Sequence, residues 1–134
     1  MISPTNHKMR NDMAGLGHYR AKRGKKLHMG VDFLCEPFQK VYAPFDMVIE
    51  RKAAPKINTD MQGIAFWNEH LSGKMFYFLP HAELIGNPVK EGQEIGIAQD
   101  VSTEYNHKMK PHIHLQIDSI DPMFILNLSE AMVL

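Results

Sequence analysis

The apolar positions of the chain fall in short runs whose period favours strands over helices. These runs are rich in Val, Ile, Phe and Tyr, and Gly, Pro and Asn repeatedly separate them. Such runs between breaker residues are typical of strands, so the pattern predicts a mainly β domain. The expected strands are Val31 to Leu34, Lys40 to Ala43, Met47 to Ala53, Gly63 to Asn68, Lys74 to Leu79, Glu94 to Ala98 and His112 to Ile117.

Two stretches do not follow this pattern. Gly15 to Gly24 has no clean period, so we expect a long loop that leads into the first core strand. The stretch Pro122 to Leu134 fits either a strand or a short helix, and both alternatives stay open. The sequence contains no internal repeat or low-complexity segment.

Length and charge narrow the classes of protein. With 134 residues, of which 44% are hydrophobic, the chain suits one compact domain, 1–134, and two independent domains are not expected. Fifteen Lys plus Arg balance fifteen Asp plus Glu, which disfavours nucleic acid and anionic membranes as partners. No apolar run approaches the roughly 20 residues that span a bilayer, and residues 1–10 are too polar for a signal peptide. We therefore expect a soluble chain without membrane insertion, whose oligomeric state stays open.

The single cysteine and the large aromatic residues are expected to be buried. Cys35 is the only cysteine, so an internal disulfide is excluded, and its place at the end of an apolar run predicts a buried, inert thiol. Trp67 and the seven phenylalanines are expected in the core rather than in a substrate platform.

Two histidines lie in the last expected strand. His112 and His114 are two residues apart, and a strand places such side chains on one face, with their bases roughly 6.5–7 Å apart. This spacing suits one imidazole on a metal ion and its neighbour near a metal-bound water. Ile113, Leu115 and Ile117 would then face the core.

A second pair of candidate ligands precedes the first expected core strand. His28 and Asp32 can converge on one ion if the backbone is extended or bends at Gly30, and nitrogen and oxygen ligands suit Zn²⁺. Three protein ligands with an open fourth position are typical of a catalytic zinc site. The alternative is a surface His28 with a turn-capping Asp32, beside a histidine pair on a solvent-facing strand. The spacing alone does not decide between these interpretations.

Both motifs stand within phrases that resemble those of the lysostaphin-like zinc endopeptidases. His28-Met-Gly-Val-Asp32, followed by Val41-Tyr-Ala-Pro44, resembles the family's His-x-Gly-x-Asp segment and the strand after it. The phrase Val89 to Gly96 resembles its turn before the last strands, and Pro111-His-Ile-His-Leu115 resembles its His-x-His strand. The resemblance runs in order from about Ile2 to Asp121.

The resemblance implies a lysostaphin-type fold, built on antiparallel sheet with long loops. It also implies that His28, Asp32 and His114 hold one Zn²⁺ per chain, and that His112 acts as general base on the zinc-bound water. The implied substrates are peptide bridges and stem peptides of bacterial cell-wall peptidoglycan. The implied place of action is the bacterial cell envelope, with a phage particle as one setting.

One position departs from the pattern of active members. They usually carry a histidine in a Tyr-x-His-Leu phrase, where this chain has Leu79. Tyr77, Tyr105 and His81 are the candidate substitute donors to the transition state. The leading prediction is a zinc endopeptidase. The alternatives are a zinc-stabilised binding protein that lost turnover at Leu79, and a structural module whose zinc only secures the fold.

The phrase at 77–80 and the insertion Ile97 to Lys110 resemble one branch of the family, which includes the vertebrate leukocyte cell-derived chemotaxins. That branch is thought to keep the zinc site without peptidase activity. This chain lacks the disulfide cysteines of those secreted proteins, so we expect a bacterial or phage relative of the same branch.

Overall fold

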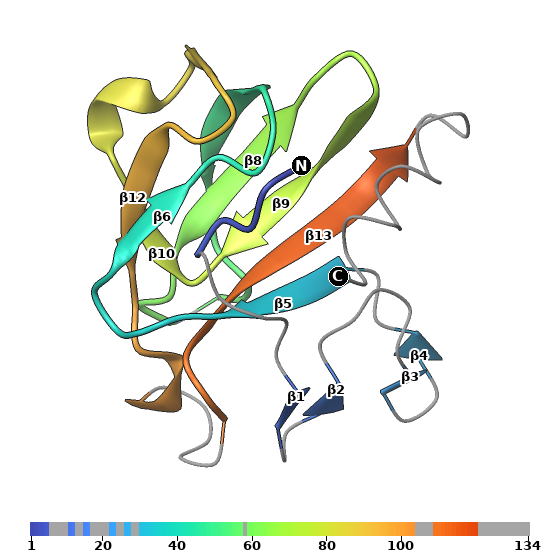
Figure 1. Ribbon diagram of the computed structural model, residues 1–134, viewed down its shortest axis with the longest axis vertical. Coiled ribbons are helices and arrows are strands. Elements are labelled where there is room, and N and C mark those ends of the chain that lie inside the picture. Colours follow the sequence, from blue (N-terminus) through green and yellow to red (C-terminus); the bar gives the residue numbers. More distant parts are fainter. Residues whose placement is uncertain are drawn as a thin grey trace.

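The computed structural model describes residues 1–5, 11–12, 15–16, 22–23, 26–27, 30–57, 59–103 and 109–120. Its largest unit is a six-stranded sheet of order β11-β7-β8-β9-β13-β5, in which all neighbours are antiparallel (Figure 1). Its strands are β5 Gly30–Leu34, β7 Met47–Ala53, β8 Gly63–Trp67, β9 Leu71–Phe76, β11 Pro88–Val89 and β13 His112–Ile120.

A smaller sheet lies against one side of the large one (Figure 1). It has the order β10-β12-β6, with β6 at Lys40–Tyr42, β10 at Phe78–Pro80 and β12 at Glu94–Ala98. The remaining elements are short: β1 Asn11–Asp12, β2 Gly15–Leu16, β3 Lys22–Arg23, β4 Lys26–Leu27 and the 3₁₀ turns η1 Ala82–Leu84 and η2 Val101–Thr103. The prediction of a mainly β, antiparallel fold is confirmed.

The hydrophobic core fills the space between the two sheets. Val41 and Ile95 of the small sheet and Ile49 and Leu115 of the large sheet are fully buried in one cluster. Along β13, Ile113, Leu115 and Ile117 are buried, so the predicted register of this strand is confirmed. The strand therefore turns the alternate residues, including His114, to the outer face of the large sheet.

Each expected strand overlaps an observed one, although β9 begins at Leu71 rather than Lys74 and β13 ends at Ile120 rather than Ile117. The largest difference lies near Tyr77. The stretch expected as one strand from Lys74 to Leu79 is instead divided between β9 and β10. Tyr77 joins them with a φ of 81°, in the left-handed region that few residues other than glycine adopt. This residue carries the chain from the large sheet to the small one. The predicted strand was wrong here because no glycine or proline marks the change of direction.

Two further expectations concern the ends of the chain. The long loop predicted at Gly15 to Gly24 contains the short strands β2 and β3, so a wholly irregular loop was wrong for these residues. Paired backbone forms there without an apolar period that the sequence could reveal. The C-terminal stretch Pro122 to Leu134 lies outside the described residues.

Cys35 is buried, as predicted, but Trp67 is not a core residue, because 47% of the residue is exposed. Trp67 alternates with Phe66, which is buried and packs on Phe45 with ring centroids 5.6 Å apart. Phe66 therefore takes the core face of β8, and Trp67 takes the outer face. Phe38 is also exposed, in the turn between β5 and β6, where its φ is 67°.

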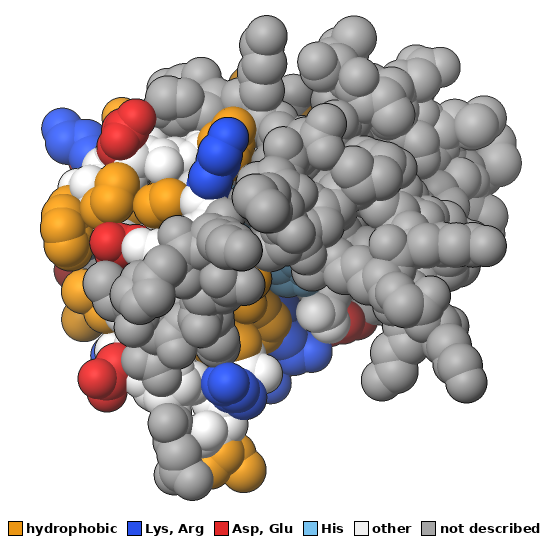
Figure 2. All heavy atoms as spheres, turned by 90° about the horizontal axis from the view of Figure 1, so that it is seen from below, with side chains coloured by type: hydrophobic (Ala, Val, Ile, Leu, Met, Phe, Trp, Pro, Cys, Tyr) orange, Lys and Arg blue, Asp and Glu red, His pale blue; other side chains and the backbone are white. Residues whose placement is uncertain are grey.

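The described surface is mixed in charge. Figure 2 shows hydrophobic, acidic and basic side chains interspersed over the described part of one face. Among the described residues, none belongs to a helix with the length and apolar character needed to cross a lipid bilayer.

Candidate metal centre

Asp32 of β5 and His114 of β13 are direct cross-strand partners. Such partners share one face of a sheet, with Cβ atoms about 4.5–5.5 Å apart. Here Oδ1 of Asp32 lies 2.6 Å from Nδ1 of His114, and the two side chains are 1% and 15% exposed. A carboxylate this deeply buried requires a positive or hydrogen-bonding partner, because water does not solvate it. The pair is therefore a structural link and a candidate ion site at once.

His112 lies two residues before His114 and is also buried. Its Nε2 is 3.9 Å from Oδ2 of Asp32, so both imidazoles approach the same carboxylate. Its Nδ1 lies 2.8 Å from the backbone carbonyl oxygen of Lys110. A carbonyl oxygen only accepts, so Nδ1 is the donor and carries a proton. In the neutral ring, Nε2 then keeps a lone pair that can accept a proton.

These side chains open into a cavity of about 250 Å³. The cavity is lined by Asp32, Pro55, Phe76, Tyr77, Met109, His112, His114 and Gln116. Its volume is large enough for a water and a small part of a substrate.

Two aromatic rings hold the imidazoles in place. Phe76, which lies opposite His114 in the β9–β13 register, stacks on its imidazole with ring centroids 6.3 Å apart and planes 7° apart. Tyr77 meets His112 edge-on, with centroids 5.1 Å apart. Tyr77, whose ring makes this contact, has a positive φ of 81°. Unusual backbone at such a position is often found at functional sites.

The donors present suit a zinc ion. A carboxylate oxygen and an imidazole nitrogen are ligands that zinc prefers, and two donors on one tetrahedral zinc lie about 3.3 Å apart. The Asp32–His114 contact is shorter, so the two side chains would separate slightly to admit an ion. Over the described ranges, no group of three His, Cys, Asp or Glu side chains is arranged to hold a metal. His28, the third expected ligand, lies outside those ranges.

The candidate hydrogen-bond donors to the transition state lie in different parts of the structure. Tyr77 lines the cavity, whereas neither Leu79 nor His81 is among the described residues that line it. Leu79 is on β10 opposite Ile97 and is half-exposed. His81 instead contacts Glu94 on the neighbouring strand, with Nε2 2.7 Å from Oε2. This hydrogen bond lowers the pKa of Glu94 below its usual value. Tyr105 lies outside the described residues.

Several residues of the cavity were not predicted from the sequence. Gln116 continues the alternation of His112 and His114 along β13, so a strict period of two identifies it. Phe76, Pro55 and Met109 carry no such signal, because they approach the site from other parts of the chain.

Comparison with known proteins finds relatives of this chain. No protein-family model matches the chain. Leukocyte cell-derived chemotaxin-2 of Bos taurus is 34% identical over 118 residues, which cover 86% of this chain and 76% of the relative. The protein of the same name from Mus musculus is 32% identical over 114 residues, which cover 83% of this chain and 74% of that relative.

A solved structure agrees with the observed fold. The NMR solution structure of lysostaphin matches 96% of this chain with a TM-score of 0.63 and 24% identity. The chain spans 54% of the lysostaphin chain. Given this fold and the extent of the identity to the bovine and mouse relatives, the chain belongs to the lysostaphin-like peptidase family, in the branch that resembles leukocyte cell-derived chemotaxin-2.

Proposed function

We propose that this protein is a zinc-dependent endopeptidase that hydrolyses peptide bonds of bacterial cell-wall peptidoglycan. The observation that carries the proposal is the meeting of Asp32, His112 and His114 at one cavity, with the two imidazoles 3.9 and 2.6 Å from the same carboxylate. In this proposal, His28, Asp32 and His114 hold one Zn²⁺ per chain. The substrate implies action at the bacterial cell envelope.

Within this site each residue has a separate task. Zinc, when bound, supplies Lewis acidity, which acidifies a water and polarises the scissile carbonyl. His112 accepts a proton at Nε2, because its Nδ1–H is held by the carbonyl of Lys110. The imidazolium that results lies beside the carboxylate of Asp32, which stabilises its positive charge. His112 then returns the proton to the leaving amine.

Tyr77 is our proposed donor to the developing oxyanion. Its ring lines the cavity and contacts His112, and a phenol hydroxyl can donate a hydrogen bond to an oxyanion. Tyr105 stays a second candidate. His81 has less support, because its imidazole is already hydrogen-bonded to Glu94.

A second candidate function is a catalytically inactive zinc-binding protein. The position of Leu79 favours it, because the residue in place of the usual histidine is half-exposed and adds no donor to the cavity. The names of the bovine and mouse relatives, which describe chemotaxins, agree with it. Zinc would then tie β5 to β13 and secure a binding surface.

Digestion of purified peptidoglycan separates the two candidates. Zinc-loaded protein is incubated with the substrate, and soluble fragments are identified by mass. The endopeptidase account expects new peptide termini that disappear after chelation and return when zinc is added back. Fragments that form equally with and without chelator would exclude zinc-dependent hydrolysis. An absence of fragments from fully zinc-loaded protein would favour the binding protein.

A further inference from the structure

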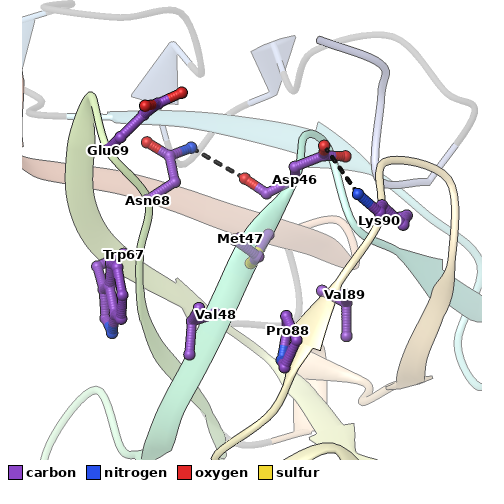
Figure 3. Close-up of a pocket in the computed structure, with 9 residues that line it drawn as sticks. All are labelled: Asp46, Met47, Val48, Trp67, Asn68, Glu69, Pro88, Val89 and Lys90. Carbon is purple, nitrogen blue, oxygen red and sulfur yellow. Dashed lines mark hydrogen bonds and ion pairs between the residues drawn. The ribbon is translucent and has the colours of Figure 1, made fainter.

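An apolar pocket of about 330 Å³ lies over strands β8, β7 and β11 of the large sheet, away from the metal centre on β5 and β13 (Figure 3). Its floor is a row of three side chains on neighbouring strands, Trp67 of β8, Val48 of β7 and Pro88 of β11, which Figure 3 shows next to one another. The register aligns them, because Val48 is the partner of both Trp67 and Pro88. We call these three residues the Trp67 row.

The Trp67 row lies on the same face of the sheet as the metal centre. Ser72 of β9 is the partner of Trp67, and Phe76 of the same strand is the partner of His114. Ser72 and Phe76 are four residues apart, so their side chains point to one face. Four residues along a strand and two strands across it place Trp67 roughly 16 Å from His114. One elongated ligand can therefore touch both places.

The polar walls of the pocket are held rigidly. The Asn68 side chain donates from Nδ2 to the carbonyl of Asp46 at 2.9 Å. Its Oδ1 accepts from the backbone N–H groups of His70 and Leu71 at 2.9 and 3.0 Å. Oδ1 of Asp46 accepts from the N–H of Glu91 at 2.9 Å. These bonds fix the β8–β9 turn and the loop before β7, so the pocket is formed before a ligand arrives.

The rim determines the chemistry of the ligand. Asp46 and Glu69 present carboxylates beside the apolar floor, and Nζ of Lys90 lies 3.8 Å from Oδ2 of Asp46. Because Lys90 offsets one of the two negative charges, the pocket has little net charge to attract a cation. It suits a neutral molecule with one apolar face and hydroxyl or amide groups along its edge. A pyranose ring has this character, because its C–H groups cover one face and its hydroxyls point outward.

We propose that the Trp67 row is a carbohydrate subsite, which stacks an N-acetylhexosamine ring of a glycan strand on Trp67. The inference rests on the proposed function, since peptidoglycan joins such glycans to peptides. The roughly 16 Å between Trp67 and His114 corresponds to about five residues of extended peptide. A sugar on Trp67 and a peptide bond at the metal centre are thus compatible with one substrate.

The test uses the fact that Trp67 is the only tryptophan of the chain. The full chain is titrated with soluble β-1,4-linked N-acetylglucosamine oligomers while its tryptophan emission is recorded. We expect a saturable blue shift and reduced quenching by acrylamide. In calorimetry, Trp67→Ala should bind about tenfold or more weakly, because truncation removes the aromatic anchor. Phe38→Ala, which removes an aromatic ring from a residue that is 74% exposed, should bind like the wild type.

Other outcomes would overturn the subsite. Emission that no oligomer changes, or equal oligomer affinity in Trp67→Ala and wild type, contradicts it. An emission change with lysine-containing peptides and not with oligomers would make the pocket a cation site instead. A His114→Ala protein should lose hydrolysis and keep the emission change. Cleavage without oligomer binding therefore refutes the subsite alone, and oligomer binding without any cleavage refutes the endopeptidase alone.

Discussion

Asp32 and His114 face each other across β5 and β13, joined by a 2.6 Å contact between carboxylate and imidazole, although 82 positions separate them in the sequence. In sequence order, β5 is the first strand of the large sheet and β13 is the last, and the contact links these two neighbours. Any ion held there would join the same two strands, so metal binding and folding stability should depend on each other. His112 and Tyr77 are among the other residues that line the cavity around this pair.

Zinc content tests the ligand set. We expect about one zinc per chain in protein purified without added metal, because three ligands and an open position form a catalytic site. His114→Ala and His28→Ala should each lose most of the zinc, as measured by elemental analysis. His70→Ala, which removes a histidine outside the cavity, is the matched control and should keep it. Full zinc content in His114→Ala would mean that the ligands are wrong.

Removal of the metal should destabilise the fold. Zinc at about 100 times its Kd adds about 2.7 kcal/mol to the free energy of unfolding, and chelation should lower the melting temperature by roughly 10 °C. Thermal unfolding followed by circular dichroism, with and without chelator, measures the shift. An unchanged melting curve after proven removal of zinc would place the ion at the periphery of the fold.

The donor to the oxyanion should be Tyr77 rather than position 79. Tyr77→Phe keeps the ring against His112 but removes the hydroxyl, so kcat should fall about 10²–10³-fold. Leu79→His should leave kcat unchanged, because that side chain is half-exposed and does not line the cavity. Peptidoglycan cleavage rates of both variants at equal zinc content provide the measurement. Faster cleavage by Leu79→His would instead identify position 79 as the missing donor.

The thiol of Cys35 should be inert. Burial raises its pKa to about 12, with smaller contributions from the negative charges of Glu36 and Asp100. At pH 8 about one thiol in 10⁴ is ionised, so alkylation by iodoacetamide should be very slow until the protein is unfolded. Mass spectrometry of native and urea-unfolded samples measures the labelling.

The raised pKa of Cys35 should also make the fold less stable at high pH. The folded pKa lies above the unfolded value, so stabilisation by the neutral thiol is complete below about pH 9 and is lost as the pH rises from about 9 to 12. Over this window Cys35 should reduce the free energy of unfolding by up to about 1.4 kcal/mol per pH unit. Cys35→Ala should lack this part of the slope. Equal slopes in the two proteins would contradict the assignment.

The sequence predicts which residues of a strand face the core better than it predicts which strands lie next to each other. Alternation along 112–117 correctly assigns Ile113 and Leu115 to the core, because a period of two has only one buried face. It does not reveal that Phe76 stacks on His114, because strand pairing depends on the whole sheet. Trp67 was placed wrongly because Phe66 and Trp67 are both apolar, so alternation between them carries no signal.

Parts of the candidate site stay predictions. The sequence indicated Asp32, His112 and His114 together, and the structure brings these three to one cavity. The roles of His28 and Tyr105 still rest on the resemblance, since both lie outside the described residues. Tyr77 was one of three candidate donors, and its place beside His112 depends on a backbone turn that no glycine or proline marks.

The most direct test of the zinc endopeptidase compares wild type with His112→Ala at equal zinc content. His112 shares a strand with His114 but is assigned to the proton and not to the ion. We therefore expect His112→Ala to keep about one zinc and to cleave peptidoglycan about 10²–10⁴-fold more slowly, as loss of a general base requires. Loss of zinc equal to that of His114→Ala, or cleavage as fast as that of the wild type, would contradict the account.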